Sequence, residues 1–459
     1  MKERERFVVV GADAAGMSAA SEARRADPDL KIVAFDKGSF ASYSQCGMPY
    51  LVGGVVGDRR RLIARTVDEF ERRGINVRLG HEVTEIDPER WVVRVLHDGA
   101  ETEHRYDRLL IATGASPVGL ALPGLDLSGV FNLDVMEDAI AVQDYIREHR
   151  PERAVIAGGG YIGLEMAENL RRLGMHVSLI QRGERLFSSV DVDIADPIDD
   201  ELERHGVDVS LYESVMRACE GSHGRVTDVL TSQGDLPADL VVLAVGVRPN
   251  VELARTAGVG LGETGAIAVD NHLRTNVSGV FAAGDCAEHY HRLLERPAWV
   301  PLGTTANKQG RIAGRNAAGG DESFAGILGT AITRVFGLEV ARTGFTEGEA
   351  RAAGLDCVAA TLDSRDHAGY MPDAKPLTVK LVAEKGTGRL LGAQAVGYGG
   401  ADKRIDVAAT ALYAGLTVED LTRLDLEYAP PFNGVWDPVQ VAATSLLRRG
   451  LADGSGSRR

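Results

Sequence analysis

The sequence AVIAGGGYIG at residues 154–163 places four apolar residues directly before a glycine-rich turn. The apolar run predicts a buried strand, and the residues after the turn, as far as about Leu173, predict a helix. A further apolar run at residues 177–180 completes a strand–turn–helix–strand unit. Glycines spaced as Gly158, Gly160 and Gly163 let the backbone approach a pyrophosphate, while the helix that follows presents N–H groups to the phosphates. The pattern therefore predicts a dinucleotide-binding domain.

The same order of elements occurs near the N-terminus, in FVVVGADAAG at residues 7–16. A helix is expected from there to about Arg25, followed by a strand at residues 31–35 that ends at Asp36. Asp36 is well placed to accept a hydrogen bond from a ribose hydroxyl. Asp13 stands where the middle glycine is usual, and its charge is expected to repel a pyrophosphate unless the side chain points away. Two such units predict two nucleotide-binding domains.

The end of the strand at residues 177–180 bears on which nicotinamide nucleotide binds. Gln181 takes the place of the acidic residue that favours a free ribose 2′-hydroxyl, and Arg182 and Arg185 follow it. A neutral residue beside arginines accommodates a 2′-phosphate. We therefore expect NADPH to be used at least as well as NADH.

The pattern changes in the last third of the chain, from about Ala331. Strand-like runs at residues 377–382 and 391–396 accompany a helical stretch at 405–414. Before that point, an apolar run at residues 279–285 indicates that the chain returns to its first domain. The expected fold class is α/β, with two Rossmann-like domains and a C-terminal α+β domain.

Length and composition exclude several classes of protein. The 459 residues suggest about three domains, and the net charge of −15 argues against general nucleic-acid binding. No apolar run has the roughly 20 residues of a membrane span, and the N-terminus leaves no room for a signal peptide before the first strand. Four scattered cysteines form no zinc pattern, so we expect neither a metal site nor a disulfide framework, and a cytoplasmic location.

Cys46 lies within SYSQCGMPY at residues 42–50, some thirty residues after the first glycine-rich turn. Ala41 and Leu51 occupy the positions where the partner of a Cys-x4-Cys pair would fall. A lone thiol in a nucleotide-binding frame predicts chemistry through a mixed disulfide, a persulfide or a sulfenic acid, because no internal disulfide can form there.

Together these motifs resemble the flavoprotein disulfide reductases with two dinucleotide-binding domains. Thr113-Gly114 is similar to the crossover motif of that family, and TNVSGVFAAGD at residues 275–285 is similar to its second FAD motif, whose carboxylate, here Asp285, contacts the ribityl chain. The resemblance implies FAD in the first domain, NADPH or NADH in the second, and a homodimer formed through the third. The implied boundaries are 1–117 and 251–326 for the FAD domain, 118–250 for the NAD(P)H domain, 327–447 for the dimerisation domain and 448–459 for a disordered tail.

The lone cysteine narrows the resemblance to coenzyme A (CoA) disulfide reductases, CoA-persulfide or polysulfide reductases, and NADH oxidases and peroxidases. The segment around Cys46 is similar to that of the CoA-disulfide reductases. The oxidases and peroxidases carry a histidine where this chain has Ala14. The implied activity is electron transfer from NAD(P)H through FAD and Cys46 to CoA disulfide or CoA persulfide. Two alternative functions are an NADH oxidase that uses a Cys46 sulfenic acid and a flavin-bound redox sensor. The sequence does not decide between CoA disulfide and CoA persulfide as the substrate.

The resemblance also implies roles for individual residues. Cys46 is the nucleophile, and Tyr428 or Tyr370 of the partner subunit would protonate the departing CoA thiolate. Trp436 departs from a lysine found in some members. The implied substrate contacts are Arg25, Ser42, Gln45, Arg73 and Asn307. The implied FAD contacts are Gly11, Ala12, Ala15, Gly16, Asp36, Lys37, Val83, Thr113, Gly114, Gly284, Asp285 and Ala306. The implied NAD(P)H contacts are Gly158, Gly160, Tyr161, Ile162, Gly163, Glu165, Gln181, Arg182, Arg185 and Gly246.

Overall fold

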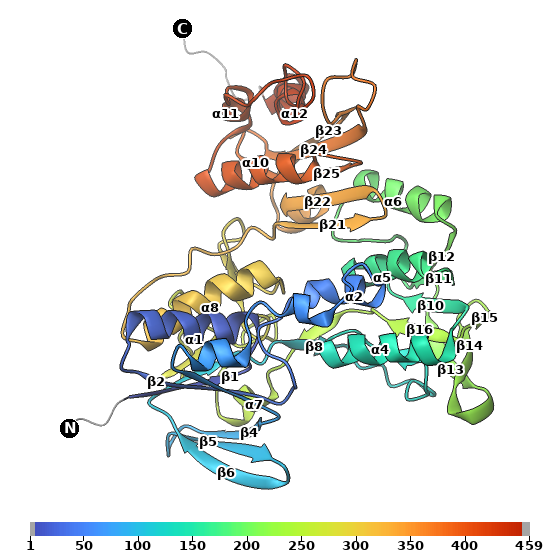
Figure 1. The fold of residues 1–459 in the computed structure, drawn as a ribbon. Coiled ribbons are helices and arrows are strands. Elements are labelled where there is room, and N and C mark those ends of the chain that lie inside the picture. The colour runs from blue at the N-terminus through green and yellow to red at the C-terminus, as the bar shows by residue number, and fades with distance from the viewer. Residues whose placement is uncertain (1–4, 452–459) are drawn as a thin grey trace. The chain divides into compact units, whose positions relative to one another are not determined.

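A computed structural model describes residues 5–451, and its contacts divide the chain into two compact units (Figure 1). The first unit holds Met1–Ala121, Phe131–Arg150 and Val245–Ile327. The second holds Leu122–Val130, Pro151–Ala244 and Leu328–Arg459. The finer domain boundaries expected from the sequence stay a prediction.

A five-stranded parallel sheet forms the centre of the first unit. Its strands, in spatial order, are β18 (Val280–Ala282), β7 (Arg108–Ile111), β1 (Arg6–Val10), β2 (Lys31–Asp36) and β3 (Ile75–Leu79). Residues 7–10 of β1 are buried, as expected for a strand covered on both faces. The predicted strand–helix–strand unit is confirmed as β1, α1 (Ala14–Ala26) and β2, and the predicted return of the chain is confirmed by β18.

Helix α1 packs directly on α8 (Gly303–Ala317). A Cβ atom on Gly310 would lie 2.2 Å from the carbonyl oxygen of Ala15, and one on Gly314 would lie 2.1 Å from that of Ala19. The two helix backbones therefore touch, which only glycine permits.

Smaller elements complete the first unit. An antiparallel sheet contains β4 (Glu82–Asp87), β5 (Val92–His97) and β6 (Ala100–Arg105). Two strand pairs join β8 (Ala115–Pro117) to β17 (Val247–Pro249) and β19 (His289–His291) to β20 (Arg296–Ala298). The remaining helices are η1 (Gln45–Gly47), α2 (Met48–Val52), η2 (Arg59–Leu62), α3 (Val67–Glu71), α4 (Met136–His149) and α7 (Glu252–Thr256).

The second unit begins with another five-stranded sheet, in which four adjacent strands pair in parallel. Its order is β12 (Val207–Leu211), β11 (His176–Gln181), β10 (Arg153–Ala157), β16 (Leu240–Leu243) and β9 (Val130–Phe131). Helix α5 (Tyr161–Arg172) follows the second glycine-rich turn, so the unit predicted there is confirmed. The other elements are α6 (Val192–Arg204), η3 (Ser222–Gly224) and the three-stranded sheet of β13 (Val215–Glu220), β14 (Val226–Thr231) and β15 (Asp235–Pro237).

The C-terminal part of the second unit is an antiparallel sheet with helices, as the α+β pattern predicted. The strand order is β21 (Ala331–Val335), β22 (Leu338–Gly344), β25 (Leu390–Gly397), β24 (Pro376–Glu384) and β23 (Cys357–Arg365). The helices are α9 (Glu347–Ala352), α10 (Ala401–Ala414), α11 (Val418–Thr422), α12 (Pro438–Leu446) and the π-helical turn η4 (Leu447–Leu451). The tail expected to be disordered thus begins inside η4, and its residues 452–459 lie outside the described part of the chain.

Among the helices of residues 5–451, none is both long enough and apolar enough to cross a membrane.

Candidate functional site

The first glycine-rich turn is shaped by backbone contacts that exclude side chains. Gly11 has φ +106°, and a Cβ atom there would lie 2.2 Å from the Ala112 carbonyl oxygen. A Cβ atom on Gly16 would lie 1.9 Å from the Gly11 carbonyl oxygen. The turn therefore brings the start of α1 close to the ends of β1 and β7, which leaves its first N–H groups available to an anion.

The Asp13 side chain contacts the backbone of the segment that carries Cys46. Its Oδ1 accepts a hydrogen bond from the backbone N–H of Tyr43 at 3.0 Å. Burial is the main reason why the pKa of Asp13 rises to about 7. Near neutral pH the carboxyl is therefore partly protonated, which reduces the repulsion expected from the sequence.

Asp36 ends β2 beside the same turn. Its two oxygens accept hydrogen bonds from the backbone N–H groups of Ala12 and Gly38, each at 2.7 Å. Burial raises the pKa of this carboxyl. Asp36 thus braces the turn, and its predicted contact with a ribose hydroxyl stays a prediction.

Asp285 carries a buried acceptor that no described residue satisfies. Its Oδ1 has no hydrogen-bond partner within residues 5–451, and burial raises its pKa to about 6. A buried acceptor without a partner destabilises the fold by about 1–3 kcal/mol. Gly284, next to it, has φ +81° and lies against Ala306 and Ala15. The arrangement fits a ligand hydroxyl donated to Asp285, as the ribityl chain of FAD would supply.

The other FAD contacts implied by the resemblance are spread through the first unit. Thr113 donates its hydroxyl hydrogen to the Asn250 carbonyl at 2.7 Å, and Gly114 has φ +68°. Ala306 is buried at the start of α8, Val83 is half-buried in β4, and Lys37 is exposed after β2.

Cys46 is presented at the surface by the short helices that follow β2. All four cysteines are described, and Cys46 alone is exposed, whereas Cys286 and Cys357 are buried and Cys219 is half-buried. Ser42 has φ +50°, and its backbone N–H donates to the Ala12 carbonyl at 2.8 Å. This bond ties the Cys46 segment to the glycine-rich turn. The helix that begins after Cys46 is α2, which has only five residues.

The predicted substrate contacts occupy α1, α8 and the Cys46 loop. Asn307 accepts a hydrogen bond from the Ser18 hydroxyl at 2.7 Å, which joins α8 to α1. Arg25, at the C-terminal end of α1, donates through Nε to Glu22 at 2.9 Å. Sequence reasoning missed Glu22, which is buried and partly neutralises Arg25. Gln45, within η1, is exposed.

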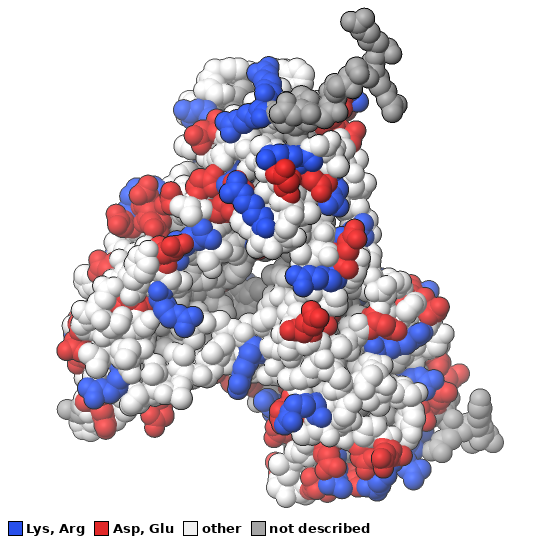
Figure 2. Space-filling model, turned by 180° about the vertical axis from the view of Figure 1, so that it is seen from behind, with Lys and Arg blue, Asp and Glu red and all other residues white. Residues whose placement is uncertain are grey.

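Arg73 lies near the same end of α1. Arg24, which directly precedes Arg25 in α1, donates a hydrogen bond to the carbonyl of Gly74 at 2.8 Å. Gly74 is the neighbour of Arg73 in the chain. On the face drawn in Figure 2, basic and acidic side chains are interspersed. An anionic substrate would therefore depend on a few local cations such as these.

The second glycine-rich turn repeats the geometry of the first. Gly158 has φ +108°, and a Cβ atom on Gly163 would lie 1.8 Å from the Gly158 carbonyl oxygen. The side-chain oxygen of Gln181 accepts the Gly159 N–H at 3.0 Å. Gln181 thus holds this turn as Asp36 holds the first, but without a charge.

Most of the other predicted NAD(P)H contacts belong to α5 and to the loop after β11. The ring of Tyr161 meets that of Phe187 edge to face, with centroids 4.7 Å apart. Burial raises the pKa of Glu165 to about 7, and its carboxyl accepts the Thr333 hydroxyl at 3.3 Å. Arg182 is exposed, and Arg185 donates to the Ser188 carbonyl at 3.3 Å. Ile162 is half-buried in α5, and Gly246, with φ +109°, belongs to the first unit.

The two predicted tyrosines meet at the surface of the C-terminal part. A hydrogen bond with Tyr428 raises the pKa of Tyr370. Tyr370 is 73% exposed and Tyr428 is 48% exposed, so a second molecule can reach both rings. The Ala368 N–H donates to the Pro430 carbonyl at 3.2 Å, which joins the two segments that carry the tyrosines.

A buried cluster beneath the tyrosines fixes both segments, and sequence reasoning missed it. Arg404, 2% exposed, donates to the Asp366 carbonyl at 2.7 Å and to Asn433 Oδ1 at 2.9 Å. Its Nε lies 3.2 Å from Asp437 Oδ2. Asn433 donates to the Glu427 carbonyl at 3.1 Å, beside Tyr428. Asp366, Asn433 and Asp437 lie 29 or more positions from Arg404 in the chain, so no local pattern indicates these contacts.

Comparison with known proteins gives the chain a family. The family model described as pyridine nucleotide-disulphide oxidoreductase matches residues 5–310, and the model of its dimerisation domain matches residues 330–438. The CoA-dependent NAD(P)H sulfur oxidoreductase of Pyrococcus abyssi is 42% identical over 97% of this chain and 99% of that protein. The CoA disulfide reductase of Staphylococcus aureus is 34% identical over 95% and 98%.

Solved structures agree with this assignment. The NAD-dependent persulfide reductase of A. fulgidus matches with a TM-score of 0.94 and 39% identity, over 97% of this chain and 83% of that one. The water-forming NADH oxidase of Lactobacillus brevis, and an engineered NADPH-using variant of it, match with a TM-score of 0.93 over 98% and 100% but are only 26% identical. The oxidase is thus a more distant relative than the CoA-dependent enzymes. The chain belongs to the pyridine nucleotide-disulphide oxidoreductase family, as the resemblance of its motifs predicted.

Proposed function

We propose that this protein uses NAD(P)H to reduce CoA disulfide or CoA persulfide through Cys46. The observation that carries the proposal is the exposed Cys46, tied by the Ser42–Ala12 hydrogen bond to a turn built for a nucleotide. Relatives that are 34–42% identical are named for CoA-dependent sulfur chemistry or CoA disulfide reduction, and they match nearly the full chain.

FAD is the cofactor that the first glycine-rich turn and Asp285 fit. The N–H groups at the start of α1 would bind its pyrophosphate, Asp36 a ribose hydroxyl and Asp285 the ribityl chain. When bound, FAD supplies the transfer of two electrons from the nicotinamide to sulfur.

The second turn would bind NAD(P)H, with NADPH accepted at least as well as NADH. The neutral Gln181 holds the turn, and Arg182 and Arg185 follow it. In the engineered NADPH oxidase, the substitutions include the loss of one aspartate and the gain of two arginines. This loop likewise has no aspartate at the end of β11 and carries two arginines, with Glu184 between them.

The chemistry at sulfur needs a thiolate and an acid. The Cys46 thiolate attacks one sulfur of CoA disulfide, forms a mixed disulfide and releases the other CoA as a thiolate. The Tyr428 or Tyr370 hydroxyl of the partner subunit would give that thiolate its proton. With CoA persulfide, Cys46 would take the outer sulfur, and the CoA thiolate would again leave.

The dimensions of α1 suit CoA. Its 13 residues span about 20 Å, with the Cys46 segment tied to its beginning and Arg25 at its end. An extended molecule with sulfur at one end and phosphates at the other matches that separation.

The test combines turnover with identification of the sulfur adduct. FAD-loaded protein should oxidise NADPH in the presence of CoA disulfide or CoA persulfide, and mass spectrometry of the oxidised protein should find a CoA adduct on Cys46. Oxygen consumption without a sulfur substrate should be slow. Rapid oxygen consumption with no sulfur-dependent turnover would contradict the proposal and favour an oxidase.

A further inference from the structure

The loop between β11 and α6, residues 182–191, carries both arginines expected to meet a 2′-phosphate. Its first part is held by the second glycine-rich turn. The Phe187 N–H donates to the Gly159 carbonyl at 2.8 Å, and the ring of Phe187 packs against Tyr161. Phe187 has φ +45°, a conformation that a residue with a large side chain rarely adopts and that its surroundings must therefore enforce.

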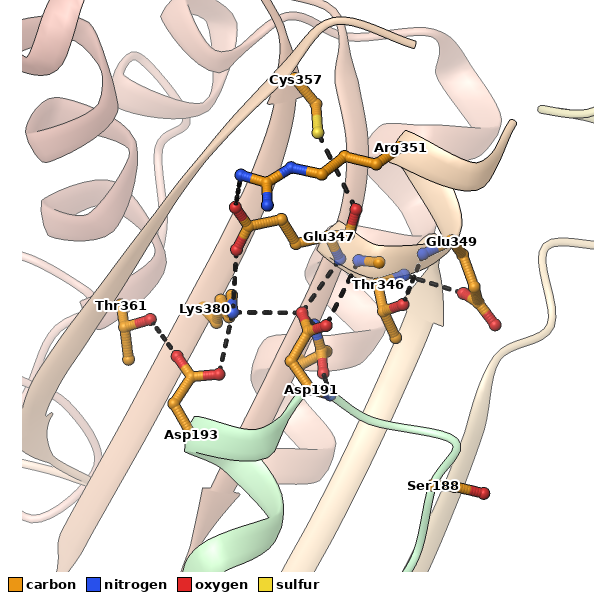
Figure 3. A network of polar contacts seen from close by, with 12 residues as sticks. Ser188, Asp191, Asp193, Thr346, Glu347, Glu349, Arg351, Cys357, Thr361 and Lys380 are labelled. Carbon is orange, nitrogen blue, oxygen red and sulfur yellow. Dashed lines mark hydrogen bonds and ion pairs between the residues drawn. The ribbon is translucent and has the colours of Figure 1, made fainter. Parts of the chain in front are cut away.

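The other end of the loop is held by the C-terminal part of the second unit, through Asp191 (Figure 3). Asp191 and Gln394 of β25 exchange two hydrogen bonds, each of 2.6 Å. The Glu347 N–H, at the start of α9, donates to Asp191 Oδ2 at 2.9 Å. Burial opposes ionisation of Asp191, yet these bonds and the charge of Lys380 outweigh it and lower the pKa of the carboxyl.

Lys380 of β24 lies at the centre of this network. Its side chain is 7% exposed, and its Nζ lies 3.1 Å from Asp191, 2.8 Å from Asp193 and 3.3 Å from Glu347 (Figure 3). A single buried cation therefore serves three carboxylates. A network of this kind adds little net stability, because desolvation offsets attraction, but it can fix one geometry.

Arg342 of β22 provides a second attachment. Its guanidinium donates to the Ser189 carbonyl within the loop and pairs with Glu349 of α9. The side chain is 12% exposed. Residues 189–191 are thus bound by three strands of the C-terminal sheet, none of which belongs to the nucleotide-binding fold.

We propose that Arg342, Lys380 and Gln394 are positioning residues for recognition of the 2′-phosphate by Arg182 and Arg185. The inference rests on the proposed use of NADPH. A loop fixed at both ends presents its arginines without the entropic cost of ordering them on binding, which strengthens binding of the group they contact. AMP, which lacks the 2′-phosphate, should not bind more tightly because the arginines are ordered.

The test measures nucleotide binding to the full-length, FAD-loaded protein by calorimetry. The probes are 2′,5′-ADP, which carries the 2′-phosphate, and AMP, which is the same molecule without it. In Lys380→Met and Arg342→Ala, the dissociation constant of 2′,5′-ADP should rise about tenfold while that of AMP changes less than about twofold. In turnover, KM for NADPH should rise in step, with KM for NADH and kcat unchanged.

The control is Lys385→Met. Lys385 pairs with Asp356 at 2.8 Å in the same part of the chain, but its side chain is 49% exposed and the pair lies outside the network. This variant should change neither dissociation constant. If Lys380→Met does not fold, Arg342→Lys, which keeps the positive charge, replaces it in the same two binding measurements.

The outcomes separate the two proposals. If wild-type protein binds 2′,5′-ADP no more tightly than AMP, the proposed use of NADPH is wrong and this inference falls with it. If the wild type prefers 2′,5′-ADP but the variants keep that preference, or lose affinity for both nucleotides equally, only the positioning role is overturned.

Discussion

Cys46 is the residue whose replacement separates the two halves of the proposed reaction. Cys46→Ser should reduce turnover of CoA disulfide at least about 100-fold, because a hydroxyl is a poor nucleophile at neutral pH. Reduction of the bound flavin by NADPH, followed in a stopped-flow instrument, should be unchanged.

The matched control is Cys219→Ser, a half-buried cysteine of the second unit that should be dispensable for turnover. Full activity of Cys46→Ser towards CoA disulfide would contradict the proposed role of the thiol.

Asp285 makes the apoprotein sensitive to pH. Its pKa rises from 3.8 in the unfolded chain to about 6 in the fold because of burial. As pH rises from about 4 to 6, the unfolded chain loses this proton first, so the free energy of unfolding falls. Asp285→Asn removes the ionisable group and therefore this loss of stability. The free energy of unfolding of the variant, compared with that of wild type, should be larger at neutral pH than near pH 4 by up to roughly 3 kcal/mol.

Denaturant unfolding of both apoproteins at the two pH values measures the difference, and FAD titration should show weaker binding to Asp285→Asn. An equal difference in stability at both pH values would show that this carboxyl does not titrate between them.

At the scale of elements, the buried cluster around Arg404 should determine the position of the tyrosine hydroxyls that donate the proton. Asn433→Ala removes the bonds that join Arg404, Asp437 and the Glu427 carbonyl. The segments of Tyr428 and Tyr370 should loosen, and kcat for CoA disulfide should fall about tenfold or more, because proton transfer depends on position. The rate of flavin reduction by NADPH should stay constant.

Thr410→Ala serves as the control, because its hydroxyl bonds only within α10, to the Asp406 carbonyl at 2.8 Å. A loss of flavin reduction in Asn433→Ala would point to general damage instead of a displaced acid.

The elements also show how far sequence reasoning reaches. The strand–turn–helix–strand units were predictable because their glycines and apolar runs are local, and Asp36 and Gln181 lie where that spacing places them. The Lys380 network and the Arg404 cluster were not predictable. Lys380 meets Asp191 across 189 positions, and the contact depends on how β24 packs near the start of α6. The sequence around a single lysine in an apolar strand does not indicate which distant carboxylates it contacts.

At the scale of the whole molecule, the proposed homodimer predicts complementation between two inactive chains. Cys46→Ser supplies intact tyrosines, and a Tyr370→Phe/Tyr428→Phe double variant supplies an intact thiol. If each site takes its cysteine from one subunit and its tyrosines from the other, random mixing should restore about one quarter of wild-type activity. Denaturing and refolding the mixture, followed by assay with CoA disulfide, tests this.

The interface itself offers a second check on assembly. Phe432, Val435 and Trp436 are 68%, 66% and 66% exposed in the single chain, close in sequence to Tyr428. Large apolar side chains exposed together indicate an interaction surface. Val435→Asp should yield monomers in sedimentation that have lost turnover, and an active monomer would disprove the shared site.

The position of β18 at the edge of the sheet, beside β7, has a consequence during synthesis on the ribosome. One edge of β7 has no partner until β18 leaves the exit tunnel, roughly 170 residues later. Synthesis of that stretch takes about 10–30 s at ordinary elongation rates. For that interval the nascent chain exposes an unpaired strand edge, and α1 lacks the helix against which its backbone rests. Chaperone engagement should concentrate in this window and end when the segment up to Ala317 has emerged.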